Sequence, residues 1–226
     1  SDYVQTNLVG TFNIIELCKQ QNVDHLLMAS TSSVYGSNKC MPFDELQKTD
    51  TPMSFYAATK KSNELMAHSY AHIFDLPITM FRFFTVYGPW GRPDMALFKF
   101  TRCMTENEEI EVYNHGEMQR DFTYVSDLVE AIQRLIHVVP PKSDQRSSFS
   151  QSTHDSLSEV APFRVVNIGN SKPVQLMDYI EALETSIGKT AKKEMLPLQP
   201  GDVADTYADI EDLESEFGYK PTTSVK

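Results

Sequence analysis

The stretch His25-Leu-Leu-Met-Ala-Ser30 and the later stretch Ile78-Thr-Met-Phe-Arg-Phe-Phe-Thr-Val86 decide the fold. Both are short and largely apolar, as expected of strands that are buried on both faces of a parallel sheet. Between them, Ser54 can cap a helix that starts at Phe55 and runs to about Phe74. This alternation of strand, helix and strand predicts an α/β fold with a doubly wound parallel sheet.

Tyr56 and Lys60 stand four residues apart in the predicted helix, so their side chains fall on one face and can meet. A nearby ammonium stabilises a phenolate and lowers a tyrosine pKa that is otherwise about 10. The pair is therefore a candidate general acid and base near neutral pH. The same spacing also arises by chance on solvated helix faces, so it needs support from the surrounding sequence.

Hydroxyl side chains follow both predicted strands at their C-terminal ends. Thr31, Ser32 and Ser33 come after the first strand, and Thr85 lies near the end of the second. Ligands of open parallel sheets bind beyond the C-terminal strand ends, so we expect these hydroxyls to converge near Tyr56. The alternative for Ser32 and Ser33 is a plain polar turn.

The rest of the chain predicts helices separated by short strands and one irregular segment. Helices are expected at 6–21, 96–104, 126–136, 174–187 and 209–217, and strands at 110–113 and 163–169. Ser126 is expected to cap the third of these helices, and Gly188 to end the fourth. Residues 140–162 are rich in serine and are predicted to form a mobile surface insertion.

Composition narrows the class of protein. At 226 residues, with 41% hydrophobic and 23% charged residues, the chain can bury one substantial core. The net charge of -11 argues against a nucleic-acid-binding surface. No apolar run approaches the roughly 18 residues of a membrane span, and no signal peptide is evident. Three cysteines without C-x-x-C spacing indicate neither disulfides nor a zinc site and favour a cytoplasmic location.

With Thr31, Tyr56 and Lys60 identified, the chain resembles the extended short-chain dehydrogenases/reductases of the NAD-dependent nucleotide-sugar epimerase/dehydratase group. Two stretches are further similar to UDP-glucuronate 4-epimerases: Phe83-Phe-Thr-Val-Tyr-Gly-Pro-Trp-Gly-Arg-Pro-Asp-Met-Ala-Leu-Phe-Lys-Phe100 and Leu196-Pro-Leu-Gln-Pro-Gly-Asp-Val203. The resemblance covers nearly all of the chain except residues 140–162. It implies a Rossmann-like NAD-binding domain from residues 1–87, 122–139 and 163–169, and a smaller α+β nucleotide-sugar-binding domain from residues 88–121 and 170–226.

The resemblance also implies a role for each candidate site residue. Tyr56 would be the acid and base, Lys60 would assist it and hold the nicotinamide ribose, and Thr31 would bind the reacting hydroxyl. Further contacts to NAD would come from Thr6 or Asn7, Ser30 and the backbone near Phe84. The substrate carboxylate would be held by Ser32, Ser33, Thr85 and Arg92, and UDP by Tyr113, Arg120 and Asp202.

Alternatives remain open for the charged members of this set. Arg92 could contact the UDP phosphates or face solvent, and Arg120 could be a structural partner of Asp121 or Asp127. Lys99 could approach UDP or lie on a solvated helix face. Gln199 stands where relatives with neutral hexose substrates often carry an arginine, which puts one phosphate contact in doubt.

The implied reaction is C4 epimerisation of UDP-glucuronate to UDP-galacturonate through a 4-keto intermediate, with Tyr56 moving the proton and NAD the hydride. A decarboxylase is a second possibility, because a 4-keto uronate is a β-keto acid that readily loses CO2. A dehydratase is disfavoured, since Ser32-Ser33 occupies the position where dehydratases normally carry Asp-Glu. A third possibility is a non-catalytic, truncated binding protein.

One family feature is absent from the sequence. The Gly-x-x-Gly-x-x-Gly turn that cradles the NAD pyrophosphate is not found among the nine glycines. The chain also starts at Ser1, directly before a helical pattern, and is expected to be an internal fragment that lacks the first β-α-β units. We therefore expect it to bind NAD poorly and to be inactive alone. The family further implies a homodimer through helices 6–21 and 54–74, with Leu65 and Met66 facing outward, although these two could equally be core residues.

Overall fold

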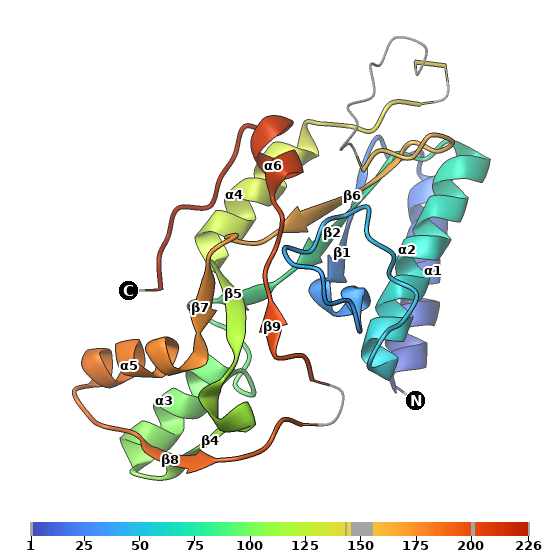
Figure 1. The fold of residues 1–226 in the computed structure, drawn as a ribbon. Helices are drawn as coiled ribbons and strands as arrows, with labels where there is room; N and C mark the ends of the chain where they lie inside the picture. The colour runs from blue at the N-terminus through green and yellow to red at the C-terminus, as the bar shows by residue number, and fades with distance from the viewer. Residues whose placement is uncertain (1, 143, 146–155, 200–201, 226) are drawn as a thin grey trace.

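The computed structural model describes residues 2–142, 144–145, 156–199 and 202–225 of the chain (Figure 1). Its helices are a π-helical turn Val4–Val9 that continues into α1 (Gly10–Gln20), α2 (Phe55–Phe74), α3 (Ala96–Glu106), α4 (Val125–Ile136), α5 (Leu176–Ile187) and α6 (Glu211–Ser215). Its strands are β1 (Leu26–Thr31), β2 (Ile78–Phe83), β3 (Thr85–Tyr87), β4 (Glu109–Val112), β5 (Gln119–Tyr124), β6 (Phe163–Ile168), β7 (Pro173–Gln175), β8 (Lys192–Met195) and β9 (Asp205–Thr206). Single-turn 3-10 helices follow β1 (Ser32–Tyr35) and β4 (Tyr113–Gly116).

A three-stranded parallel sheet in the order β1-β2-β6 forms the centre of the upper part of the molecule in Figure 1. Helices α1 and α2 cover one face and α4 covers the other. Successive side chains of a strand alternate between faces, and here both faces are apolar. The register pair Met80 and Val165 packs toward α1 and α2, whereas the next pair, Phe81 and Val166, packs in the cluster that contains α4. The predicted α/β class is confirmed.

Strand β1 differs from the prediction of burial on both faces. Leu27 and Met28 are half-buried and Ala29 is exposed, whereas every residue of β6 is buried. The reason is position: β1 is the edge strand of this sheet among the described residues, so one of its sides is uncovered. An apolar sequence indicates that a strand is suited to burial, but whether the strand is buried depends on the elements that pack beside it.

The second predicted strand, over residues 78–86, is two strands in the structure. β2 ends at Phe83, and β3 starts at Thr85 and pairs with β5 in another sheet. Phe84 marks the break, and its backbone N–H donates to the Ile168 carbonyl at 3.3 Å. The prediction of one continuous strand was wrong because each half is apolar, and only the pairing partners show where the chain changes sheets.

The lower part of the molecule in Figure 1 contains the remaining strands with α3 and α5. Strand β5 pairs in parallel with β3 and β9 and antiparallel with β7, while β4 and β8 form a two-stranded parallel sheet. A separate apolar cluster, which includes Phe122 and Tyr179 stacked at 4.3 Å, lies between these elements. This part supplies residues to the candidate site through β5 and the segment that precedes β9.

Helix ends confirm some local predictions and correct others. The Ser54 hydroxyl accepts from the Ala57 N–H at 3.1 Å and caps α2 as predicted, and Gly188 ends α5 in the left-handed conformation. Ser126 was wrongly predicted to cap α4. Strand β5 runs straight into this helix, so Tyr124 is the N-cap residue, Val125 is already helical, and the cap makes no side-chain hydrogen bond. Leu65 is exposed as expected, whereas Met66 packs against the core beside α1.

The predicted mobile insertion at 140–162 lies partly outside the described residues, which omit 143 and 146–155. Its described ends are packed. Pro140, Pro141 and Ala161 are buried, and the Ser158 N–H donates to the Phe163 carbonyl at 2.8 Å. The loose surface segment that the composition predicts therefore excludes both of these ends.

Two searches of the described residues complete the fold. None of the helices in this part of the chain is long and apolar enough to cross a membrane. No group of three or more His, Cys, Asp or Glu side chains within the same residues could hold a metal ion.

Candidate active site

Tyr56 lies in the first turn of α2, immediately after the helix start that Ser54 fixes. Its side chain is half-buried, and the ring of Tyr3 packs against it at 5.8 Å between centroids. Ser54 itself lines the cleft described below. The capped helix start therefore places Tyr56 next to the cleft.

Lys60 follows one turn later and reaches across to the sheet. Its ammonium donates to the Ala29 carbonyl of β1 at 2.7 Å. Burial lowers the pKa of Lys60, and the negative charge of Glu64 acts in the opposite direction. Lys60 is thus held at the edge strand, where Ala29 is exposed.

A hydroxyl turn follows β1, as the sequence predicts. Thr31 is 7% exposed and caps the 3-10 helix: its Oγ1 accepts from the Ser33 N–H and donates to Ser33 Oγ, both at 3.2 Å. The turn ends at Gly36, whose φ of 56° is left-handed. A Cβ at this position would lie 1.9 Å from the Thr51 carbonyl oxygen, so only glycine fits there.

A cleft of about 170 Å³ lies beyond the C-terminal end of β1. It brings together five residues that the sequence analysis selects from distant segments: Ser32, Ser33, Thr85, Arg120 and Asp202. The 3-10 helix after β1 supplies two hydroxyls, β3 supplies the third, β5 supplies the arginine, and the segment before β9 supplies the aspartate. Hydroxyls and a guanidinium are the donors that carboxylate and phosphate oxygens require.

Arg120 is partly covered and already has hydrogen-bond partners. Its Nη2 pairs with Asp202 Oδ1 at 3.0 Å, and its Nη1 donates to the Ala204 carbonyl at 2.6 Å. Burial lowers the pKa of Arg120, and the Asp202 charge opposes that effect. The alternative pairing with Asp121 is not seen: Asp121 accepts from the N–H groups of Asn170, Ser171 and Ala208 at 2.7–3.0 Å. Nor is Arg120 bonded to Asp127, which accepts from Thr222 and Thr223.

Arg92 lies outside this cleft. Its side chain is 74% exposed and forms an ion pair with Asp94 two residues later. That pairing raises the pKa of Arg92. Arg92 lines a separate cavity of about 40 Å³ that shares one residue, Thr85, with the cleft.

Tyr113, the predicted uracil contact, and Lys99 do not line the cleft. Tyr113 begins the 3-10 helix after β4, and Lys99 pairs with Glu111 at 2.9 Å. The Lys99 ammonium, followed by a hydrogen bond from Tyr113, lowers the pKa of Glu111. Lys99 and Tyr113 therefore meet around one carboxylate.

The predicted cofactor contacts differ in their burial and in their hydrogen-bond partners. Asn7 donates to the Thr59 hydroxyl at 3.0 Å and joins the first helical segment to α2, while Thr6 is exposed. Ser30 is buried and donates to Glu64 at 2.6 Å. Phe84 is 7% exposed and its ring lies in the core near Tyr35 and Phe43.

Sequence reasoning missed the residues that form the remaining wall of the cleft. These are Gly36, Phe43, Met53, Ser54, Val203 and Thr206. Four of them, Gly36, Phe43, Met53 and Ser54, belong to the loop between the 3-10 helix and α2, which the sequence presents only as an irregular segment. The signal that was available was Gly36 directly after the hydroxyl turn, since a glycine there indicates a close approach of backbone.

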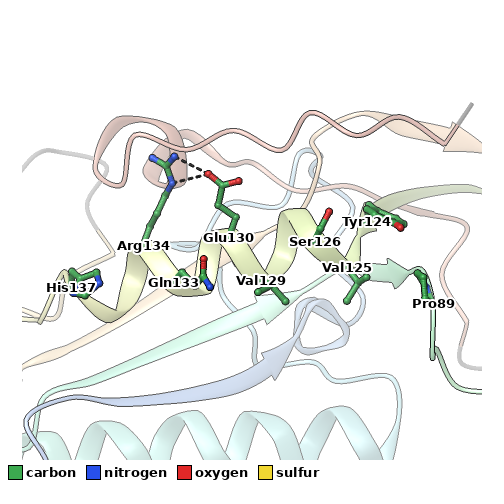
Figure 2. Close-up of a pocket in the computed structure, with 9 residues that line it drawn as sticks. All are labelled: Pro89, Tyr124, Val125, Ser126, Val129, Glu130, Gln133, Arg134 and His137. Atoms are coloured by element: carbon green, nitrogen blue, oxygen red, sulfur yellow. Dashed lines mark hydrogen bonds and ion pairs between the residues drawn. The ribbon is translucent and has the colours of Figure 1, made fainter.

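A larger cavity of about 800 Å³ lies elsewhere, along the outer face of α4 (Figure 2). Figure 2 shows Glu130 and Arg134 pointing toward one another across one turn, and their ion pair measures 2.8 Å. None of the sequence-predicted site residues lines this cavity. Size therefore does not identify the site in this molecule; the convergence of hydroxyl and charged side chains does.

The arrangement can support proton transfer beside an anion-binding cleft. Tyr56 can exchange a proton, Lys60 supplies positive charge on the same helix, and the cleft supplies hydroxyls and Arg120. The described residues fit one part of a nicotinamide cofactor: the half-buried Lys60 ammonium lies at the uncovered edge strand β1, where a ribose hydroxyl could accept from it. No glycine-rich turn for the pyrophosphate is present in the sequence.

Comparison with known proteins supports this interpretation. The model of the NAD dependent epimerase/dehydratase family matches residues 1–144. A probable UDP-glucuronate 4-epimerase of Rhizobium meliloti (strain 1021) is 54% identical over 99% of this chain and 65% of its own length. An uncharacterised 37.6 kDa protein of Escherichia coli O111:H- is 56% identical over 99% of this chain and 66% of its own length.

A solved structure agrees. The UDP-glucuronic acid 4-epimerase of Bacillus cereus, in complex with UDP-glucuronic acid and NAD, superposes with a TM-score of 0.82 at 32% identity, over 98% of this chain and 64% of that one. The chain thus spans about two thirds of the relatives it matches. The family is NAD-dependent, which confirms the cofactor expected from the sequence. The chain belongs to the NAD dependent epimerase/dehydratase family.

Proposed function

We propose that this chain carries the catalytic residues of a UDP-glucuronate 4-epimerase. The observation that supports it most is the cleft itself, in which Ser32, Ser33, Thr85 and Arg120 converge beside the helix that carries Tyr56. Relatives and a structural neighbour with this activity support the substrate class. Because this chain spans only about two thirds of those proteins, the activity is proposed for the longest natural polypeptide that contains this sequence.

In the proposed reaction, Tyr56 accepts the proton of the sugar 4-hydroxyl while Thr31 holds that oxygen. Bound NAD+ would supply the hydride chemistry at C4, which removes a hydride from one face of the sugar and restores it to the opposite face. Tyr56 then gives its proton back to the 4-oxygen, so no net oxidation occurs. Lys60 stabilises the phenolate form of Tyr56 throughout, and the catalyst returns to its starting state.

The orientation of the substrate carboxylate determines whether the 4-keto intermediate is epimerised or loses CO2. Ser32, Ser33 and Thr85 would each donate to a carboxylate oxygen and keep the C5–C6 bond poorly aligned with the 4-keto group. Arg120 and Asp202 would bind the diphosphate and ribose. Arg92 would join the grip by exchanging Asp94 for the substrate, which its exposed position allows. Tyr113 would stack near the uracil.

Cofactor contacts in this proposal come from Lys60, Ser30, Asn7 or Thr6, and the backbone near Phe84. The domain assignment follows the same division: residues 1–87, 122–139 and 163–169 serve the cofactor, and residues 88–121 and 170–226 serve the nucleotide sugar. A homodimer through α1 and α2 belongs to the proposal as well. For the 226-residue chain alone we propose weak NAD binding, which calorimetry with NAD+ tests; tight binding would contradict it.

The test of the activity is proton NMR of UDP-glucuronate incubated with the longest natural polypeptide and NAD+. Appearance of UDP-galacturonate supports the proposal. Formation of a UDP-pentose would assign the protein to the decarboxylases. Turnover of UDP-glucose in place of UDP-glucuronate would show that the carboxylate grip is misassigned.

A further inference from the structure

A buried ion pair lies behind the candidate site. Glu64 on α2 and Arg82 on β2 are each 3% exposed. Arg82 Nε donates to Glu64 Oε1 at 3.0 Å and Nη2 pairs with Oε2 at 2.9 Å, which is the bidentate geometry. Neither residue lines the cleft. Removing two charges from water is costly, so such a pair calls for a specific reason.

The surroundings satisfy the remaining hydrogen-bonding groups of the pair. Ser30 Oγ donates to Glu64 Oε1 at 2.6 Å, and Lys61 pairs with Oε2 at 3.1 Å. Arg82 Nη1 donates to the Glu45 carbonyl at 3.2 Å, and the guanidinium lies 4.8 Å from the centre of the Tyr35 ring. The network thus joins α2, β1, β2 and the loop that borders the cleft.

The geometry ties this pair to Lys60. Glu64 lies one helical turn after Lys60, on the same face of α2. On β1, Ala29 accepts from Lys60 and the next residue, Ser30, donates to Glu64. Successive turns of the helix are therefore fixed to successive residues of the strand, and Arg82, the register partner of Ser30, secures the second attachment.

We propose that Glu64 and Arg82 are positioning residues: together they hold α2 in register on β1 and β2 and set the charge that the Lys60 ammonium meets. This inference rests on the proposed function for its catalytic meaning. The charged groups that pair with Glu64 are Arg82 from β2 and Lys61 from α2, and the charged group that acts on Lys60 is Glu64. Strand β1 contributes the uncharged Ala29 carbonyl to Lys60 and the Ser30 hydroxyl to Glu64.

The two partners act on Lys60 with opposite sign. The carboxylate of Glu64 favours the ammonium form, so Glu64→Gln should lower the pKa of Lys60. Arg82→Met leaves that carboxylate without its strongest partner, so it should raise the pKa. A role in stability alone would loosen the helix in both variants and move the reactivity of Lys60 in one direction.

The test measures Lys60 directly in the longest natural polypeptide, without substrate or NAD. Pulses of acetic anhydride between pH 7 and 9.5 acylate free amines, and mass spectrometry reads the fraction modified at Lys60, with exposed Lys48 as internal reference. Glu64→Gln should accelerate acylation of Lys60 about 3- to 10-fold, because loss of the carboxylate charge lowers the pKa of Lys60 and enlarges the fraction of free amine. Arg82→Met should slow it, and Glu64→Asp should stay within about twofold of wild type.

Arg164 on β6 and Glu216, which directly follows α6, provide the matched control, because they form another largely covered ion pair, at 2.7 Å. Glu216→Gln should leave Lys60 acylation unchanged. Equal acceleration in Glu216→Gln, shifts of the same direction in Glu64→Gln and Arg82→Met, or no shift in Glu64→Gln would overturn the inference. If Arg82→Met fails to fold by circular dichroism, Glu64→Gln and Glu64→Asp decide the matter. Because the readout needs no turnover, failure of the proposed activity leaves this result interpretable.

Discussion

Arg82 and Arg92 belong to one short stretch of sequence, yet the protein treats them in opposite ways. Arg82 is 3% exposed and fixed by Glu64, the Glu45 carbonyl and the Tyr35 ring, whereas Arg92 is 74% exposed and pairs with Asp94 in solvent. The first belongs to the region that carries Tyr56 and Lys60, the second to the rim where a substrate carboxylate is proposed to bind. Packing inside the protein therefore fixes Arg82 in the region that carries Tyr56 and Lys60. The exposed turn, in contrast, leaves Arg92 accessible to the proposed substrate carboxylate.

The largest expected effect on turnover comes from Tyr56. Tyr56→Phe removes the hydroxyl that exchanges the proton, and turnover of UDP-glucuronate by the longest natural polypeptide should fall by about 10³-fold or more. The measurement is proton NMR of product formation with NAD+ present. Tyr3→Phe is the matched control, because its ring packs against Tyr56 but carries no proposed role; an equal loss in both variants would contradict the assignment.

The two arginines themselves give the next largest effect. Arg82→Met leaves the buried Glu64 carboxylate without its main partner and should lower the free energy of unfolding by about 3–5 kcal/mol. Arg92→Met removes an exposed pair that water screens, and should change that free energy by less than about 0.5 kcal/mol. Urea unfolding of both variants checks the contrast. Equal losses of unfolding free energy in the two variants would show that Arg92 contributes as much to stability as Arg82 and would contradict the contrast.

Arg120 stands between these extremes, since it is partly covered and held by Asp202 and Ala204. Arg120→Met should weaken the binding of UDP by about 1.5–3 kcal/mol, the range for a hydrogen bond to a charged group. Calorimetry with UDP measures this. Unchanged affinity would remove the cleft from the nucleotide site and place the diphosphate elsewhere.

Glu45, which belongs to the loop beside the cleft, should make the free energy of unfolding depend on pH. Burial raises its pKa to about 8, and the Asn167 N–H, which donates at 2.6 Å, acts against that rise. A carboxyl whose folded pKa exceeds its unfolded value of about 4.3 stabilises the fold at low pH and loses that contribution as pH rises toward 8. Unfolding free energy should therefore fall between pH 5 and 8, by up to about 1.4 kcal/mol per unit from this group.

Glu45→Gln removes the titrating proton and keeps an oxygen that can accept from Asn167. Subtracting the unfolding free energies of the variant from those of the wild type at each pH isolates the contribution of Glu45. A flat difference from pH 5 to 8 would mean that this carboxyl titrates at its ordinary value in the folded protein.

Local sequence patterns predicted a substantial part of this molecule. The Ser54 cap and α2, the parallel pairing of the strands on either side of it, and the meeting of Ser32, Ser33 and Thr85 follow from short-range periodicity and from one rule about strand ends. These features depend on residues close together in sequence, or on a geometry common to parallel sheets.

The features that escaped prediction depend on distant partners. The break at Phe84 is set by pairing with β5, the Arg120–Asp202 pair joins residues 82 positions apart, and the exposure of β1 depends on what lies beside it. The pairing of Arg92 with Asp94 on an exposed turn, and its absence from the lining of the cleft, also could not be read from the sequence, which left open a contact to the carboxylate, to the phosphates or to solvent. The periodicity of apolar residues along the chain does not predict these long-range pairings or the exposure that depends on them.

The most direct test of the account follows the fate of the carboxylate carbon. UDP-[6-¹³C]glucuronate is incubated with the longest natural polypeptide and NAD+, and carbon NMR records the label over time. The account predicts that the label remains in a hexuronate whose C4 configuration is inverted, because the cleft hydroxyls hold the carboxylate while Tyr56 moves the proton. Release of the label as ¹³CO2 or bicarbonate, with a UDP-pentose left behind, would contradict it.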